Sequence, residues 1–208
     1  IDGGVWLSVA RELTGGGNRP NEALYPPVVP GLVLLLTSLF GVLTAVQVLG
    51  LVACFVLTFG TAMLARHLGA PRLMQVLAGV LAGCAGITGE SISWGGYPQA
   101  IGLGFLAVAV WRYEQALTGR RHNVVLAGVL GGVVAWTSHL VLVQALVAFL
   151  VVTVISAAHR REFRVLKRGV GALMVVGASI AALGPVYPSL LGVLGTNVDA
   201  ANGIRWSD

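Results

Sequence analysis

The chain has 208 residues, and its 13 Lys and Arg against 8 Asp and Glu give a formal net charge of +5. Only 10% of the residues are charged and 56% are hydrophobic, with a mean hydropathy of +0.86, whereas an ordinary soluble domain has roughly 25% charged residues. This composition excludes a soluble globular enzyme and a disordered tail. A nucleic-acid partner is not expected either, because the basic residues punctuate apolar runs and form no basic stripe.

The amino-terminal stretch, residues 1–27, predicts a short amphipathic helix. Asp2 can cap its start, and Gly15 opens a run of three glycines that ends it. The apolar residues between them have helical spacing and are Val5, Trp6, Val9, Ala10 and Leu13. Such a helix suits the membrane interface. Because the first residue is Ile1 and not Met, we expect the chain to be part of a longer protein.

Five windows without a charged residue predict the membrane segments, since one crossing needs about 20 mostly apolar residues. The windows are residues 28–65, 73–89, 91–111, 123–158 and 169–198. The first and the fourth are too long for one helix, and we expect a break in each, near residues 41–47 and 137–140. The sequence thus predicts an all-α polytopic bundle over residues 28–188 with about six or seven membrane segments. A β-barrel is excluded because the runs do not alternate apolar and polar residues.

Three connections between these segments carry most of the basic residues. They hold ten of the thirteen Lys and Arg residues and two acids, a net of +8, and the rest of the chain has a net of −3. The ten are Arg66, Arg72, Arg112, Arg120, Arg121, Arg160, Arg161, Arg164, Lys167 and Arg168. Such an excess is typical of cytoplasmic connections, so residues 90–99 and the loop or tail at 189–208 are expected outside. Binding of anionic membrane lipids is an alternative role for these cations.

The side of the amino-terminal stretch stays open at this point. If residues 28–65 cross twice, residues 1–27 share a side with the basic connections. If one half is re-entrant, or the run is one long kinked helix, residues 1–27 lie outside. Each half has about 19 residues and is long enough to span. Segment length therefore favours two crossings, which would put residues 1–27 on the side of the basic connections, whereas the charge distribution favours placing that side in the cytoplasm.

Two groups of polar residues interrupt the later apolar runs. Glu90, Trp94, Tyr97 and Gln99 cluster in a short outward turn, where an acid, two aromatic faces and an amide suit a sugar ring. An aromatic belt beside a solvated loop is the alternative. His139 lies in a charge-free window, where an ionisable group suggests function; a neutral His bonded to a neighbouring helix is the alternative. No cofactor motif is found, and a divalent cation is left open.

The residues at the amino terminus resemble a known family. An acidic residue at Asp2, a short interfacial helix, a Gly-rich linker and Tyr-Pro-Pro from Tyr25 look like the first extracytoplasmic loop of GT-C membrane glycosyltransferases, including the actinobacterial ones. Residues 94–99 at the start of a span, and a later span with His139, are similar to the same group. The 208 residues do not include the family's first span or its large soluble carboxy-terminal domain, so the resemblance is to the amino-terminal part of the transmembrane module.

This resemblance implies a polyprenyl-phosphate-linked sugar donor and a glycan, lipid or protein acceptor in the cell envelope. It implies that Asp2 takes the proton of the acceptor hydroxyl; an ordinary helix N-cap is the alternative. The donor phosphate needs a cation, which we expect from Arg11, Arg19 or Arg205, although each can also be a solvated charge. The other expected substrate contacts are Tyr25, Glu90, Trp94, Tyr97, Gln99 and His139.

Two hypotheses from other classes remain beside this glycosyltransferase of the cell membrane. A transporter or channel-like bundle predicts paired broken helices and ionisable residues at the membrane midplane, and His139 is the one such residue in the sequence. A non-catalytic membrane scaffold would keep the fold without the chemistry.

Overall fold

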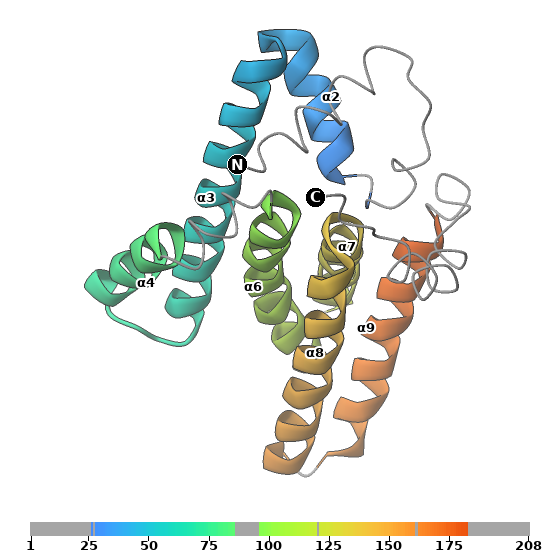
Figure 1. The fold of residues 1–208 in the computed structure, drawn as a ribbon. Helices are drawn as coiled ribbons and strands as arrows, with labels where there is room; N and C mark the ends of the chain where they lie inside the picture. Colours follow the sequence, from blue (N-terminus) through green and yellow to red (C-terminus); the bar gives the residue numbers. More distant parts are fainter. Residues whose placement is uncertain (1–25, 27, 86–95, 120, 161, 183–208) are drawn as a thin grey trace, which may run out of the picture.

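The computed structural model describes residues 26, 28–85, 96–119, 121–160 and 162–182, which form helices joined by short connections (Figure 1). The helices are α2 (Val28–Phe40), α3 (Val42–His67), α4 (Arg72–Cys84), α6 (Tyr97–Leu117), α7 (Arg121–Thr137), α8 (His139–Arg160) and α9 (Phe163–Ala182). No strand occurs in these residues, and the predicted all-α class is confirmed there. Each of the seven predicted apolar segments overlaps one of the described helices. How many of them cross a membrane stays a prediction, and the predicted interfacial helix lies outside the described residues.

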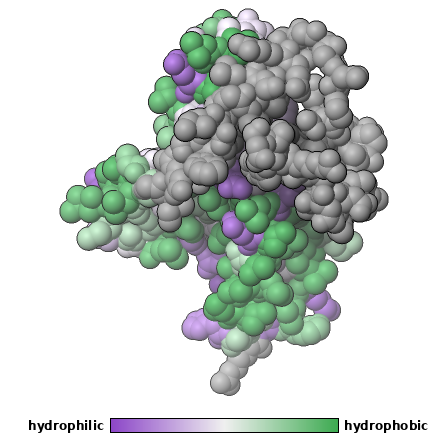
Figure 2. All heavy atoms as spheres, in the orientation of Figure 1, coloured by the Kyte–Doolittle hydropathy of each residue, from purple (hydrophilic) through white to green (hydrophobic). Residues whose placement is uncertain are grey.

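Three of the described helices, α3, α8 and α9, are long and apolar enough to cross a membrane. Within their most apolar stretches, only 28%, 22% and 22% of the residues are buried inside the chain. Large apolar side chains therefore stay exposed, among them Phe55 of α3 and Leu150 of α8, and Figure 2 shows apolar residues covering α4 and the lower part of α8. An apolar surface this extensive is unfavourable in water, so the three helices indicate a membrane protein.

Both long apolar runs break inside the ranges predicted for them. Gly41 separates α2 from α3 and has a φ of 80°, a backbone conformation that favours glycine. Ser138 separates α7 from α8, and its Oγ accepts a hydrogen bond from the Val141 N–H at 3.5 Å, which caps α8. Helix α2 has 13 residues and is about 20 Å long at 1.5 Å per residue. It folds back along α3 (Figure 1) and is shorter than the hydrocarbon core of a bilayer.

The helix ends extend beyond the charge-free windows. Arg112 lies inside α6, which continues to Leu117, and Lys167 and Arg168 lie inside α9, which begins at Phe163. Long basic side chains can reach the water interface from a helix, so a charge does not end the helix. Arg168 also stabilises its neighbour, because its Nη1 donates to the Leu117 carbonyl at 3.0 Å, at the end of α6.

Contacts between helices establish the directions in which they run. Helices α3, α6 and α8 are parallel, as four pairs show: Gly60 with Gly104, His67 with Glu114, Gly102 with Val141, and Tyr113 with Thr153. Helices α4, α7 and α9 run the other way. The ends of α3, α6 and α8 and the starts of α4, α7 and α9 therefore belong to the same end of the described helices. In Figure 1 the end of α8 and the start of α9 are lowest, and the start of α4 lies out to the left. We call this end of the helices the basic end, because it carries Arg66, Arg72, Arg112, Arg121, Arg160, Arg164, Lys167 and Arg168.

The buried residues form two apolar clusters that share α6. The first cluster joins α2 and α3 to the start of α6 and includes Val33, Leu49 and Tyr97. The second joins the rest of α6 to α7, α8 and α9 around Tyr113 and Phe149. Because the partly buried Phe105 of α6 packs against both, α6 is the element through which the two clusters are connected.

Tyr113 links three helices at the centre of the second cluster. Its ring stacks on Phe149 of α8 with 4.4 Å between centroids, and its hydroxyl lies 2.7 Å from the Thr153 Oγ1. The Thr153 hydroxyl donates to the Phe149 carbonyl at 2.8 Å, so its oxygen is left to accept from Tyr113. The Gly169 carbonyl of α9 lies 3.4 Å from the same tyrosine hydroxyl. This buried group is therefore satisfied, as a polar atom in an apolar core must be.

Helices α3 and α6 cross in backbone contact at two glycines. A Cβ atom at Gly60 would lie 2.1 Å from the Gly104 carbonyl oxygen, and one at Gly104 would lie 2.4 Å from the Val56 carbonyl oxygen. Backbone oxygens of packed helices cannot move aside as a flexible side chain can. The crossing therefore requires glycine at both positions, as in other helix pairs that approach closely through small residues.

Gly104→Ala should separate α3 from α6, since the added methyl group has no space. We expect a loss of about 1–3 kcal/mol in the free energy of unfolding, measured as a lower thermal midpoint of the purified protein in detergent. Gly177→Ala is the matched control, because nothing lies within 4 Å of its Cβ position on α9. The control should be neutral, or stabilise by up to about 1 kcal/mol through helix propensity. Equal midpoints for the two variants would contradict the close crossing.

Candidate functional site

The structure describes three of the predicted site residues, Tyr97, Gln99 and His139. The other predictions fall outside the described residues and stay predictions: Asp2, Arg11, Tyr25, Glu90, Trp94 and Arg205.

Tyr97 and Gln99 lie in the first turn of α6. Pro98 sits between them, where proline is favoured because the first turn has no intrahelical partner for its N–H. The Tyr97 side chain is only 6% exposed and packs in the first cluster with Val29 and Val33 of α2. Gln99 is exposed. Tyr97 therefore belongs to the apolar core at the start of α6, and Gln99 is the more accessible of the two for a ligand.

His139 is the first residue of α8 and is partly buried beside a polar turn. In this turn the Thr137 hydroxyl donates to the Val133 carbonyl at 2.6 Å, and the buried Trp136 indole Nε1 has no hydrogen-bond partner among the described residues. A Cβ at Gly102 of α6 would lie 3.2 Å from Val141, so the starts of α6 and α8 pack together. Gln99 and His139 thus share the end of the molecule opposite the basic end (Figure 1), and no hydrogen bond links them in the described structure.

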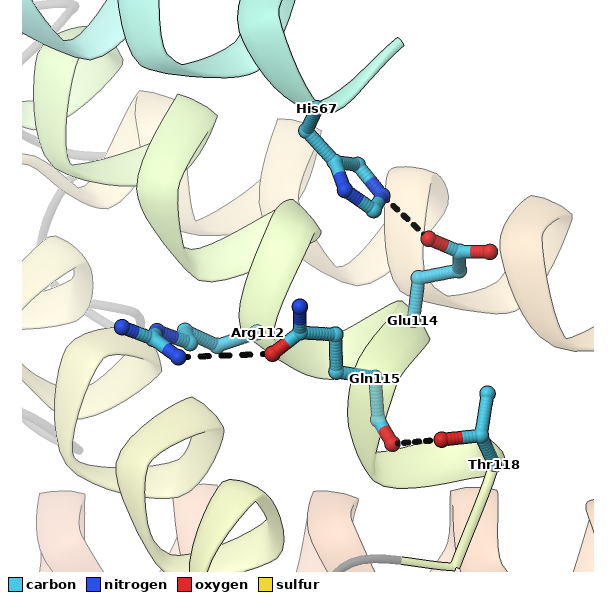
Figure 3. A network of polar contacts seen from close by, with 5 residues as sticks. All are labelled: His67, Arg112, Glu114, Gln115 and Thr118. Carbon is cyan, nitrogen blue, oxygen red and sulfur yellow. Dashed lines mark hydrogen bonds and ion pairs between the residues drawn. The ribbon is translucent and has the colours of Figure 1, made fainter. Parts of the chain in front are cut away.

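A second polar cluster lies at the basic end and was not predicted from the sequence. The His67 Nε2 at the end of α3 contacts the Glu114 carboxylate of α6 (Figure 3), with the two side chains 23% and 40% exposed. The His67 and Trp111 ring centroids are 5.8 Å apart. The Arg112 guanidinium carbon lies 4.2 Å from the Trp111 centroid, a cation–π contact, and its Nη1 donates to the Gln115 Oε1 at 3.3 Å.

A cavity of about 220 Å³ adjoins this cluster between α3, α6 and α8. Its apolar walls are Leu64, Leu68, Val110, Val152 and Ile155, and its polar groups are His67, Glu114 and Ser156. An imidazole in contact with a carboxylate can exchange a proton with it. A zinc site takes three or four protein ligands, and no group of three or more His, Cys, Asp or Glu gathers in the described residues.

The His67–Glu114 pair could not be found from spacing, because 47 positions separate the two residues. One signal was available in the sequence. Glu114 is one of only two acids beside the ten cations of the basic connections. An acid in such a basic region is expected to pair with a basic side chain.

Comparison with known proteins identifies no relative: no protein-family model, curated protein or solved structure matches this chain. The resemblance to GT-C glycosyltransferases therefore rests on the quoted sequence features alone.

A double-mutant cycle tests the contact between α3 and α6 at the basic end. His67→Gln and Glu114→Gln should be coupled by roughly 0.5–1 kcal/mol in the free energy of unfolding, the range for a partly exposed contact between polar side chains. Unfolding of the purified protein in detergent measures the coupling. Glu162→Gln is the control, because it removes the other acid of the basic end. It should show no coupling energy with His67→Gln. Additive effects of the first pair would show that the contact does not persist in solution.

Proposed function

We propose that the chain is part of a multi-pass integral protein of the cell membrane, a GT-C-like glycosyltransferase that moves a sugar from a polyprenyl-phosphate donor to an extracytoplasmic acceptor. The observation that supports this best is the separation of charge from the predicted substrate contacts. Every Lys, Arg, Asp and Glu in the described residues lies at the basic end, whereas Gln99 and His139 lie at the opposite end.

The sign of that charge supports an orientation. The basic end has eight Lys and Arg residues against two acids, Glu114 and Glu162, among the described residues. Cytoplasmic connections of membrane proteins carry such an excess of Lys and Arg. With the basic end in the cytoplasm, the starts of α6 and α8 face the outside, where the donor and the acceptor of a cell-envelope glycosyltransferase meet.

The length of α2 bears on the side of the amino-terminal stretch. Its 13 residues are too few to cross a bilayer, which takes about 20, so a single crossing of residues 28–65 by α3 is favoured. The start of α2 lies toward the end opposite the basic end in Figure 1. Both features support an extracytoplasmic position for residues 1–27, as the proposed role of Asp2 requires.

The proposed reaction is an inverting transfer. The acceptor oxygen bonds to the anomeric carbon while the bond from that carbon to the phosphate oxygen breaks, and the acceptor proton goes to the Asp2 carboxylate. Arg11 or Arg205 stabilises the negative charge that develops on the departing phosphate. Tyr25, Glu90 and Trp94 join Gln99 and His139 in holding the sugar, through aromatic faces and hydrogen bonds.

A transporter is the second candidate, and the break at Gly41 favours it. Broken or short apolar helices line the substrate sites of many transporters, and α2 and α4 have 13 residues each. Such sites also use charged groups within the membrane. Among the described residues, His139 is the one His, Lys, Arg, Asp or Glu away from the basic end, and it lies at a helix start and not in the middle of a span, so the glycosyltransferase proposal is preferred.

Cysteine accessibility tests the orientation. In a Cys54→Ala/Cys84→Ala background, Gln99→Cys should react with a membrane-impermeant maleimide added to intact cells. Arg66→Cys, also exposed but at the basic end, should react only after permeabilisation. Asn21→Cys should behave like Gln99→Cys if the amino-terminal stretch is outside. The opposite labelling pattern would reject the glycosyltransferase proposal.

Sugar transfer by the complete protein tests the chemistry. Asp2→Asn should lower kcat by about 10²–10⁴-fold, the contribution of a general base, in an assay that follows a labelled sugar from its polyprenyl phosphate to the acceptor. Glu12→Gln, on the polar face of the same predicted helix, is the matched control and should keep full activity. Full activity of Asp2→Asn would refute its catalytic role. If the wild-type protein transfers no sugar, the glycosyltransferase proposal is wrong, and a transporter or a non-catalytic scaffold becomes the better hypothesis.

A further inference from the structure

We propose that the first turns of α9 form a binding site for the phosphate of an anionic phospholipid. The inference does not depend on the glycosyltransferase proposal. It concerns a hollow of about 430 Å³ at the corner between α8 and α9, lined by Glu162, Phe163, Arg164 and Lys167. We call this hollow the α9 corner.

The two cations of the α9 corner lie side by side and are exposed. Arg164 and Lys167 are three residues apart on α9 and therefore share one face of the helix. Neither has a hydrogen bond or ion pair within the described structure, whereas Arg168 is engaged with the Leu117 carbonyl. The Lys167 Nζ lies 5.8 Å from the Phe163 ring centroid. Two unpaired cations beside a hollow provide the charge that a phosphate needs.

The position of these cations in the helix is electrostatically unfavourable without an anion. The start of a helix carries the positive end of its dipole and attracts negative groups. The first turn of α9 has no acidic residue, yet Arg164, Lys167 and Arg168 all lie within its first six residues. Glu162, just before the helix, is the one acid of the α9 corner. A bound phosphate would relieve the repulsion at this end of the helix dipole.

The apolar side chains next to the cations favour a lipid over a soluble phosphate. Phe163, Leu166 and Val170 are 70%, 37% and 57% exposed and follow one another along α9 at helical spacing. Acyl chains can cover them while the headgroup stays at Arg164 and Lys167. The site also lies where the candidate spans α8 and α9 meet at the basic end, which is the level of the headgroups of the cytoplasmic leaflet.

Lipid binding by matched double variants tests this site. The full chain is purified in a neutral detergent and exposed to equal amounts of phosphatidylglycerol and phosphatidylcholine, and bound lipid is counted by native mass spectrometry. Wild type should prefer phosphatidylglycerol, and Arg164→Gln/Lys167→Gln should weaken that binding by roughly tenfold or more. Arg66→Gln/Arg72→Gln removes two charges from the same end and should change it by less than about twofold. Equal losses would mean a diffuse basic surface and would overturn the proposal.

Thermal midpoints provide a second measurement that is independent of lipid counting. Without lipid, Arg164→Gln/Lys167→Gln should have a midpoint at or above that of wild type, because the repulsion at the helix start is removed. Phosphatidylglycerol should raise the wild-type midpoint and leave that of the variant unchanged. A rise of the same size with millimolar inorganic phosphate would indicate a soluble-anion site. That result would reject the phospholipid site. If the variant does not fold, the wild type alone decides, and a wild type without a preference for phosphatidylglycerol would also reject the site.

Discussion

The backbone contact between Gly60 and Gly104 is the constraint on which the arrangement of the described helices depends. It fixes how α3 crosses α6, and α6 is the element shared by the two apolar clusters. The register of this crossing brings His67 to Glu114 near one end of α6, and Tyr97 is buried in the first cluster near the other end. In lipid, where apolar side chains gain little from leaving the solvent, such close packing supplies much of the association between helices.

The breaks between helices could be predicted from the sequence, because local chemistry determines them. Gly41 can adopt a positive φ without strain, and Ser138 can cap a new helix with its own side chain. The helix ends were less predictable. A charge-free window reflects the cost of placing a charge in lipid, but α6 and α9 continue to their charged turns, where a long side chain such as Arg112 reaches the interface.

The polar contacts depend on the register between helices that are far apart in the sequence. That register could not be predicted from the sequence alone. Tyr113 meets Thr153 across 40 positions, and His67 meets Glu114 across 47. The His67–Glu114 pair follows from the α3–α6 crossing, which two distant glycines set, and the Tyr113–Thr153 pair follows from the packing of α6 against α8. The position of Gln99 and His139 at one end needs only the helix directions, so that part of the candidate site could be inferred from alternating segments.

The basic end shows why the place of a charge matters as well as its number. Orientation in a membrane depends on how many Lys and Arg residues follow a span, and cations anywhere in the connection would satisfy it. Arg168 has a further structural role, because it completes the end of α6. Arg164 and Lys167 have no such partner in the described structure and lie in the first two turns of α9, near the end of the helix dipole that disfavours cations. The net charge of the basic end accounts for membrane orientation. The placement of Arg164 and Lys167 in α9 is the feature that supports a specific anion site.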